Sequence, residues 1–432
     1  MYHEPMVALE RSGSLENQNE FQTPFCNAIL KEFTKQYPEK REAIKTVLKE
    51  IDAQAIHNID VFQSTKFPGV RFSHSKLTVT QEFVEKLGSF QFPNTPPSAS
   101  PEATGRGEET EGEPRAKRHD YFLFTAMNPP PGGHALTVQD VAIDRFIRLL
   151  PLVAGALSRG EKPPEANVYL LGDTTGLGGT VTTEWVQGVK DRGFDQDGEL
   201  YAEFIKQVEL KNVETGREPH IVLQGVSKGA VVAEKTSKHL PKNLLAHTQR
   251  LLDNPAGDHG DEAILERARK GLQVLIGYKS ESDYHSKGGI MQTLGAYGGP
   301  FTRFLTSHLA KEKNIPEDSR GQQLLKWRVV FSDVWNLVKG SSLDTEETRS
   351  FIRRGIDDPV TESETRTRDV QEKVKGGIPV PFFSSGKSSE VPFKGRHFFI
   401  YDRYHRWSTI LDFVKSAKNI KPEDWKYRTI EN

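Results

Sequence analysis

Between residues 119 and 257, short apolar runs alternate with longer helical patterns. The runs read "YFLFTAM", "ANVYLLG", "HIVLQG" and "TQRLLD", and amphipathic segments such as "GELYAEFIKQVEL" lie between them. A run that is apolar at nearly every position fits a strand buried on both faces, and strands that alternate with helices are typical of a parallel sheet. The sequence therefore predicts an α/β fold with a mostly parallel sheet flanked by helices.

The rest of the chain divides by composition. Residues 93–118 are rich in Pro, Ser, Gly and charged residues and contain almost nothing apolar, which is typical of a linker. Between 258 and 376 helical patterns dominate, and strand signals resume at "IPVPFFSS" and "RHFFIYDR". The predicted organisation is a mainly helical N-terminal extension (1–92) with a strand-like stretch, "GVRFSHSKLTVT", the linker (93–118), the first part of the core (119–257), a helical cap insertion (258–376), and the last strands and helix of the core (377–432).

Composition excludes several classes of function. The 432 residues carry 58 Lys and Arg against 59 Asp and Glu, so there is no net positive charge to attract nucleic acid or an anionic membrane. Cys26 is the only cysteine, which rules out an intrachain disulfide and a zinc site built on several cysteines. No metal or cofactor is expected. The N-terminus lacks a secretory pattern and no apolar run is long enough to span a membrane, so a cytoplasmic location is expected. The oligomeric state is left open.

One short motif suggests chemistry. Gly225-Val226-Ser227-Lys228-Gly229 lies between the third apolar run and a helical pattern. Chance would give roughly 0.2 such G-x-S-x-G matches in this chain, so the motif alone is weak and its context matters. Small residues beside the serine let a strand and a helix approach closely around a strained nucleophile. Ser227 is therefore a candidate nucleophile, with an ordinary polar turn residue as the alternative.

A second pattern supports the first. Asp173-Thr174-Thr175-Gly176-Leu177-Gly178-Gly179-Thr180 follows the preceding apolar run. Together, the two motifs and the order of strands resemble the α/β-hydrolase superfamily over 119–256 and 377–432, less than half of the chain. The resemblance implies that Ser227 is the nucleophile of a Ser-His-acid triad. It also implies that the base is His405, between the last strand and the closing helix, and that the acid is Glu390, with Asp253 as the alternative.

The same resemblance implies an oxyanion hole of two backbone N–H groups. Lys228, directly after the nucleophile, would supply one of them. The other would come from Met127 or Asn128 in the loop after "YFLFTA", because the three prolines that follow have no N–H. The His-Gly pair that is common in this loop of the family is absent here.

These features predict a serine hydrolase that acts on an ester, thioester or amide of a small-molecule acyl substrate, with esters and thioesters favoured over peptides. A non-catalytic binding or scaffolding protein of the same fold is the rival hypothesis. The predicted cap would cover the site and exclude water. Five of its residues could line the substrate pocket or form the cap's own small core: Leu272, Leu275, Ile276, Trp327 and Trp335.

Overall fold

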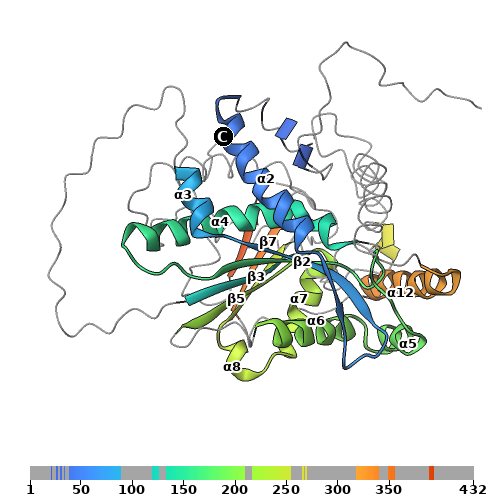
Figure 1. Cartoon of the computed structure of the whole chain (residues 1–432). Helices are drawn as coiled ribbons and strands as arrows, with labels where there is room; N and C mark the ends of the chain where they lie inside the picture. Colours follow the sequence, from blue (N-terminus) through green and yellow to red (C-terminus); the bar gives the residue numbers. More distant parts are fainter. Residues whose placement is uncertain are drawn as a thin grey trace, which may run out of the picture.

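The computed structural model (Figure 1) describes part of the chain. The described residues are 21, 26–27, 30–31, 34, 38–88, 119–125, 133–209, 217–253, 265–266, 268–269, 318–339, 349–355 and 389–393. The predicted linker lies outside them. Within these residues no helix combines the length and the apolar character needed to cross a membrane.

A single eight-stranded sheet forms the centre of the described structure. Its strands are β1 (Asp60–Gln63), β2 (Arg71–Thr78), β3 (His119–Thr125), β4 (Ala166–Leu171), β5 (Glu218–Val226), β6 (Thr248–Asp253), β7 (Arg349–Gly355) and β8 (Ser389–Phe393). They lie in the order β1-β2-β4-β3-β5-β6-β7-β8. The pairings of β2 with β1 and with β4 are antiparallel, and all the others are parallel. The mostly parallel sheet predicted from the sequence is confirmed.

Helices cover both faces of the sheet (Figure 1). One face packs against α2 (Arg41–His57), α3 (Gln81–Gly88) and α4 (Gln139–Ser158), and the other against α5 (Thr183–Arg192), α6 (Phe194–Glu209), α7 (Lys228–Lys238) and α12 (Arg320–Lys339). Three short helices complete the described elements: η1 (Pro38–Lys40), η2 (Ala135–Val138) and α8 (Lys242–Leu245).

The strands are apolar at nearly every position because helices cover both faces of the sheet. Along β5, Val222 joins the core beneath α4, whereas its neighbours Ile221 and Leu223 join the core beneath α6 and α7. Successive side chains of a strand point to opposite faces, so a strand covered on both sides needs apolar residues at every position.

Two segments contribute more to the sheet than the sequence predicted. The described part of 1–92 is mainly helical, as expected, but its strands β1 and β2 also extend the sheet beyond β4. The range 258–376 supplies the helix α12 and also β7, which pairs with β6 and was not predicted. β8 lies between the two late runs expected to be strands, and these runs fall outside the described residues. Local patterns identify a strand more readily than its partner in the sheet.

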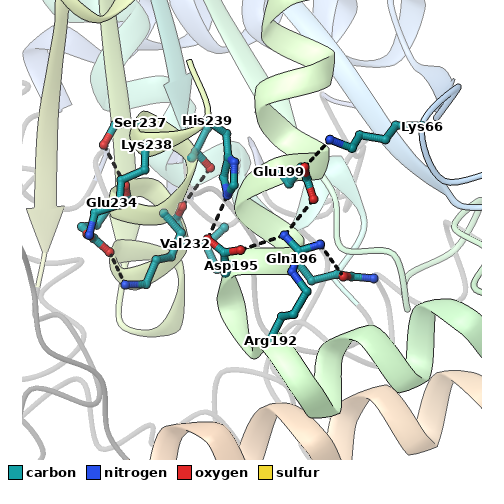
Figure 2. Close-up of polar contacts among 12 residues, drawn as sticks. Lys66, Arg192, Asp195, Gln196, Glu199, Val232, Glu234, Ser237, Lys238 and His239 are labelled. Atoms are coloured by element: carbon teal, nitrogen blue, oxygen red, sulfur yellow. Dashed lines mark hydrogen bonds and ion pairs between the residues drawn. The ribbon is translucent and has the colours of Figure 1, made fainter. Parts of the chain in front are cut away.

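Surface ion pairs link the helices of one face (Figure 2). Arg192 at the end of α5 binds Asp195 and Glu199 of α6 at 2.7 and 2.8 Å, and Glu199 also pairs with Lys66. His239, after α7, contacts Asp195 at 2.8 Å. Such partly exposed pairs contribute at most about 1 kcal/mol each to the stability of the fold. The apolar core is therefore the main reason that these helices stay packed.

The connections of the sheet indicate where a ligand would bind. From β3 the chain passes through α4 on one face to β4, and from β5 it passes through α7 on the other face to β6. β3 and β5 are neighbours, so the chain leaves their carboxyl ends in opposite directions. In open α/β sheets this switch point is where ligands bind. The residue that follows β5 is Ser227.

Candidate active site

Ser227 has a strained backbone. Its φ is 56° and its ψ −121°, and it is the sole non-glycine residue with positive φ in the described part of the chain. Side chains rarely occupy this region, which costs about 1–3 kcal/mol and is found mainly at functional sites. The serine is partly exposed, at the start of α7 and directly after β5.

An ordinary capping role does not explain this conformation. A capping serine has an extended backbone, and its hydroxyl accepts a hydrogen bond from the second or third N–H of the helix. Thr182 before α5 behaves in this way, with φ −109° and its hydroxyl accepting from the Trp185 N–H at 3.1 Å. Ser227 makes no capping hydrogen bond. Ser227 therefore does not serve as the cap of α7.

Gly225, the first glycine of the motif, has the role that the sequence predicts. A Cβ placed on Gly225 would lie 1.9 Å from the carbonyl oxygen of Gly229. Any side chain at this position would force β5 and α7 apart. The close approach that a nucleophile turn requires is therefore present.

The residue after Ser227 has a buried, charged side chain. The Lys228 ammonium donates to Asp173 at 3.1 Å and to Asp333 of α12 at 3.0 Å, and all three side chains are at most 7% exposed. Asp173 also accepts from the backbone N–H of Thr175 at 2.6 Å. The Asp173 motif is thus an anchored loop that holds the residue next to the nucleophile. Only the position of Lys228 next to a tight turn could have hinted at this in the sequence.

A third buried acid lies in the same cluster. Burial and the charge of Asp333 raise the pKa of Asp197 well above its usual range, although Lys228 opposes the shift. Burial also raises the pKa of Asp333, against the attraction of Lys228. Burial alone would lower the pKa of Lys228, but the surrounding carboxylates raise it overall. The raised pKa of Lys228 favours its charged form, and the raised pKa of Asp197 favours its neutral form, which limits the negative charge of the cluster.

We expect Asp197→Asn to make the protein more stable than the wild type at alkaline pH. The folded wild type keeps a proton on Asp197 that the unfolded chain releases above about pH 4. That stabilising contribution is complete below pH 4 and is lost as the pH rises through the raised pKa of Asp197. Asparagine stays neutral, so its advantage should grow with pH, by about 1.4 kcal/mol for each unit of the pKa shift. Urea unfolding at pH 5, 7 and 9 measures the difference in the free energy of unfolding between the variant and the wild type.

Asp195→Asn, two residues away on α6, is the matched control. Burial raises the pKa of Asp195, but hydrogen bonds from Arg192 and His239 lower it overall. The wild-type contribution of Asp195 is therefore present above about pH 4 and is lost as the pH falls. The two variants should show opposite trends with pH, with the smaller effect at the partly exposed Asp195. An effect of Asp197→Asn that did not change with pH would contradict a protonated Asp197.

The two candidate triad acids lie at different distances from Ser227. Asp253 ends β6, and its backbone is paired with Val226, the residue before the nucleophile. Glu390 is the second residue of β8, paired with Ile352 of β7. β8 lies three strands from β5, or about 14 Å at a strand spacing of about 4.8 Å. The backbone thus brings Asp253, and not Glu390, next to the nucleophile turn.

Several predicted site residues lie outside the described part of the chain. These are the base His405, the oxyanion candidates Met127 and Asn128, and the pocket candidates Leu272, Leu275 and Ile276. The loop that follows β3 is described again from Gly133, whose carbonyl accepts from the backbone N–H of Asp173 at 2.8 Å. Among the described residues, no group of three or more His, Cys, Asp or Glu could hold a metal ion.

Trp327 and Trp335 lie on the outer face of α12 and are 59% and 54% exposed. The inner face packs against α5 and carries polar residues, including Lys326, which donates to the Gly176 carbonyl at 2.8 Å, and Asp333. α12 therefore lies beside the Asp173 loop, with Val329 buried in the core on this side of the sheet and the two tryptophans facing away from it. These tryptophans are not buried in a core, which was one of the two predicted roles.

The sheet and the strained serine at its switch point define the class: the chain has the α/β-hydrolase fold. No protein-family model and no curated protein matches this sequence. Among solved structures, the chain is similar to a peroxisomal alpha-beta-hydrolase from Saccharomyces cerevisiae, with 10% identity over 84% of this chain and 90% of that chain and a TM-score of 0.36.

It is also similar to a thermophilic esterase from Thermogutta terrifontis, with 13% identity over 69% of this chain and 89% of that chain and a TM-score of 0.30. An alpha-beta serine hydrolase homologue from Coxiella burnetii shows 10% identity over 83% of this chain and 95% of that chain, with a TM-score of 0.30. Sequence identities and TM-scores as low as these do not assign a function. A functional assignment must therefore come from the residues of the site.

Proposed function

We propose that the chain is a serine hydrolase that cleaves an ester or thioester of a small acyl substrate through an acyl-enzyme. One observation carries this proposal. Ser227 is held in a strained conformation at the switch point of the sheet, and its hydroxyl makes no capping bond. Strain of this kind destabilises the fold and persists where a reaction uses it. A nucleophile presented at the end of a strand uses it in this way.

The proposed reaction has two halves. The Ser227 hydroxyl attacks the substrate carbonyl while His405 takes its proton. The tetrahedral intermediate collapses to an ester on Ser227, and His405 gives the proton to the leaving alcohol or thiol. Water, activated by His405, then hydrolyses that ester and restores the free serine. The backbone N–H of Lys228, in the first turn of α7, would stabilise the oxyanion, since such groups have no partner within the helix.

The second oxyanion donor would be the N–H of Met127 or Asn128. Both residues follow β3, which is the neighbour of β5 in the sheet. The loop after β3 and the turn after β5 therefore begin at the same edge of the sheet. This arrangement supports two donors that converge on the carbonyl attacked by Ser227.

For the triad acid we favour Asp253 over Glu390. Two hydrogen bonds and an imidazole between them span about 8 Å from the serine oxygen to the carboxylate, if each bond is about 2.8 Å. Asp253 begins one strand away from Ser227 at the same edge of the sheet, within this range. Glu390 begins three strands away and level with Gly225, farther inside the sheet. This reverses the order of preference drawn from the sequence.

We also propose that residues 258–376 form a cap over the site. It is supported by the position of α12, which comes from the range 258–376 and reaches Lys228 through Asp333. Trp327 and Trp335 lie on the other face of α12, so they do not support a pocket at Ser227.

A fluorophosphonate probe tests the proposed function. The purified full-length chain should be labelled at one site, identified as Ser227 by peptide mass spectrometry, because the probe reacts with activated serines and mimics the oxyanion. Heat-denatured protein is the control and should not be labelled. If the folded chain stays unlabelled and p-nitrophenyl esters are not hydrolysed, the non-catalytic alternative is correct.

A further inference from the structure

The Lys228 side chain joins three parts of the chain below the nucleophile turn. Lys228 begins α7, Asp173 begins the loop after β4, and Asp333 lies in the middle of α12. The two ion pairs, at 3.1 and 3.0 Å, span 55 and 105 residues of sequence. Each of the three residues is at most 6% exposed. The ammonium is therefore bound from two independent elements and shielded from water.

A buried ion cluster of this kind is weak evidence of a role in stability. Removing an ion pair from water costs several kcal/mol, and well-packed apolar residues of similar size are often as stable or more so. The helix itself is apolar beyond its first turn: Ala230, Val231 and Val232 follow Lys228 in α7 and are fully buried. A leucine or methionine at this position would suit that core. The buried charges therefore call for an explanation other than stability.

The position of Lys228 next to the nucleophile suggests an explanation for the buried charges. Lys228 contributes both a backbone N–H next to the strained serine and a side chain fixed at its far end by Asp173 and Asp333. A hydrogen-bonded side chain restrains the rotation of its own residue more strongly than an apolar contact, because hydrogen bonds are directional. An N–H that stabilises an oxyanion must be held in place before the reaction, since misplacement by about 1 Å can cost roughly a hundredfold in rate.

We propose that the Lys228 side chain is a positioning residue: its bonds to Asp173 and Asp333 fix the first turn of α7 so that the Lys228 N–H points to the oxyanion of the substrate bound at Ser227. This inference rests on the proposed function. It adds a role for α12, a segment from the predicted cap, as a support of the catalytic turn. The Lys228 ammonium itself does not touch the substrate.

The test separates positioning from folding. Lys228→Met alone would leave buried acids without their cation and could unfold the chain. The double variant Lys228→Met with Asp333→Leu removes the cation together with one of its two acids and leaves only Asp173 without its partner, so the fold is verified before rates are compared. We expect its kcat for p-nitrophenyl butyrate, and its rate of fluorophosphonate labelling, to fall roughly tenfold to a hundredfold, with KM nearly unchanged. Circular dichroism and thermal unfolding verify the fold.

Two single variants at position 333 provide rescue. Asp333→Asn keeps an oxygen that can accept from Lys228 and should retain most of the rate, whereas Asp333→Leu should not. Ser332→Ala is the matched control. Within the described part of the chain the Ser332 hydroxyl bonds to the Arg328 carbonyl of its own helix alone, at 2.8 Å, and its loss should leave kcat unchanged. If the double variant does not fold, the comparison of kcat between Asp333→Asn and Asp333→Leu tests the proposal by itself.

Each outcome is decisive. A folded double variant with reduced kcat and unchanged KM, together with rescue by Asp333→Asn, supports the proposal. Wild-type rates in the double variant, or equal losses for Asp333→Asn and Asp333→Leu, overturn it and leave Ser227 as the nucleophile. A wild-type chain that is neither labelled nor active refutes the proposed function, and this inference with it.

Discussion

Replacing Ser227 by alanine is expected to lower kcat/KM for p-nitrophenyl esters by a factor on the order of 10³ or more, because removal of a triad nucleophile leaves only binding and oxyanion stabilisation. The fold should persist, since alanine has nearly the same backbone preferences and Ser227 makes no capping bond. Initial rates and the thermal unfolding midpoint are measured side by side. More than about a tenth of wild-type activity in the variant would show that Ser227 is not the nucleophile.

Ser227→Gly is the companion variant. Glycine adopts positive φ readily, so it should relieve the strain at φ 56° and raise the free energy of unfolding by about 1 kcal/mol or more. It should lose activity as completely as alanine. The pair separates chemistry from conformation: both variants lack the hydroxyl, but only glycine removes the strain. A glycine variant no more stable than the alanine variant would mean that the turn is not strained.

The second large effect is expected at the triad acid. Asp253→Asn should lower kcat by roughly a thousandfold or more, because an amide cannot hold the catalytic imidazole in the required tautomer. Glu390→Gln should change kcat by less than about threefold, since its strand lies far from the nucleophile turn. Steady-state kinetics at one pH measure kcat for both variants, and circular dichroism verifies that both are folded. The reverse result would restore Glu390 as the acid, and small losses in both would place the acid elsewhere in the chain.

The parts of the site that could be predicted are encoded within a few residues. The motif at 225–229 lies between a recognisable strand and a recognisable helix, and the need for glycine at position 225 follows from the close approach of the two backbones. The parallel sheet followed from strands that are apolar at every position. Both signals are local, so one sequence was sufficient to identify them.

The remaining features depend on contacts between distant residues. Nothing near Lys228 indicates that its partners are Asp173 and Asp333, 55 and 105 residues away. The edge position of β8, which separates Glu390 from the site, depends on β7, and β7 is a short strand with three arginines among its seven residues. A run so rich in charge does not read as an interior strand.

The apolar pattern of α12 was misleading in a different way. Its spacing correctly predicted a helix, but helical spacing does not say which face meets the protein. Apolar faces are usually buried. Here Trp327 and Trp335 face outward, while Val329 and the polar residues Lys326 and Asp333 contact the rest of the chain. The ion pair of Asp333 and the hydrogen bond of Lys326 join α12 to distant parts of the chain, and a sequence does not reveal these partners.

The position of β7 has a consequence for protein engineering. Cap-like insertions are often removed or exchanged between enzymes as if they were separate units. In this chain, deleting 258–376 would remove β7 and leave the backbone N–H and C=O groups of β6 without their partners on that side. An unprotected strand edge readily pairs with another molecule, so the shortened chain should aggregate. A safer truncation keeps residues 318–355, which preserve β7 and also the Asp333 contact to Lys228.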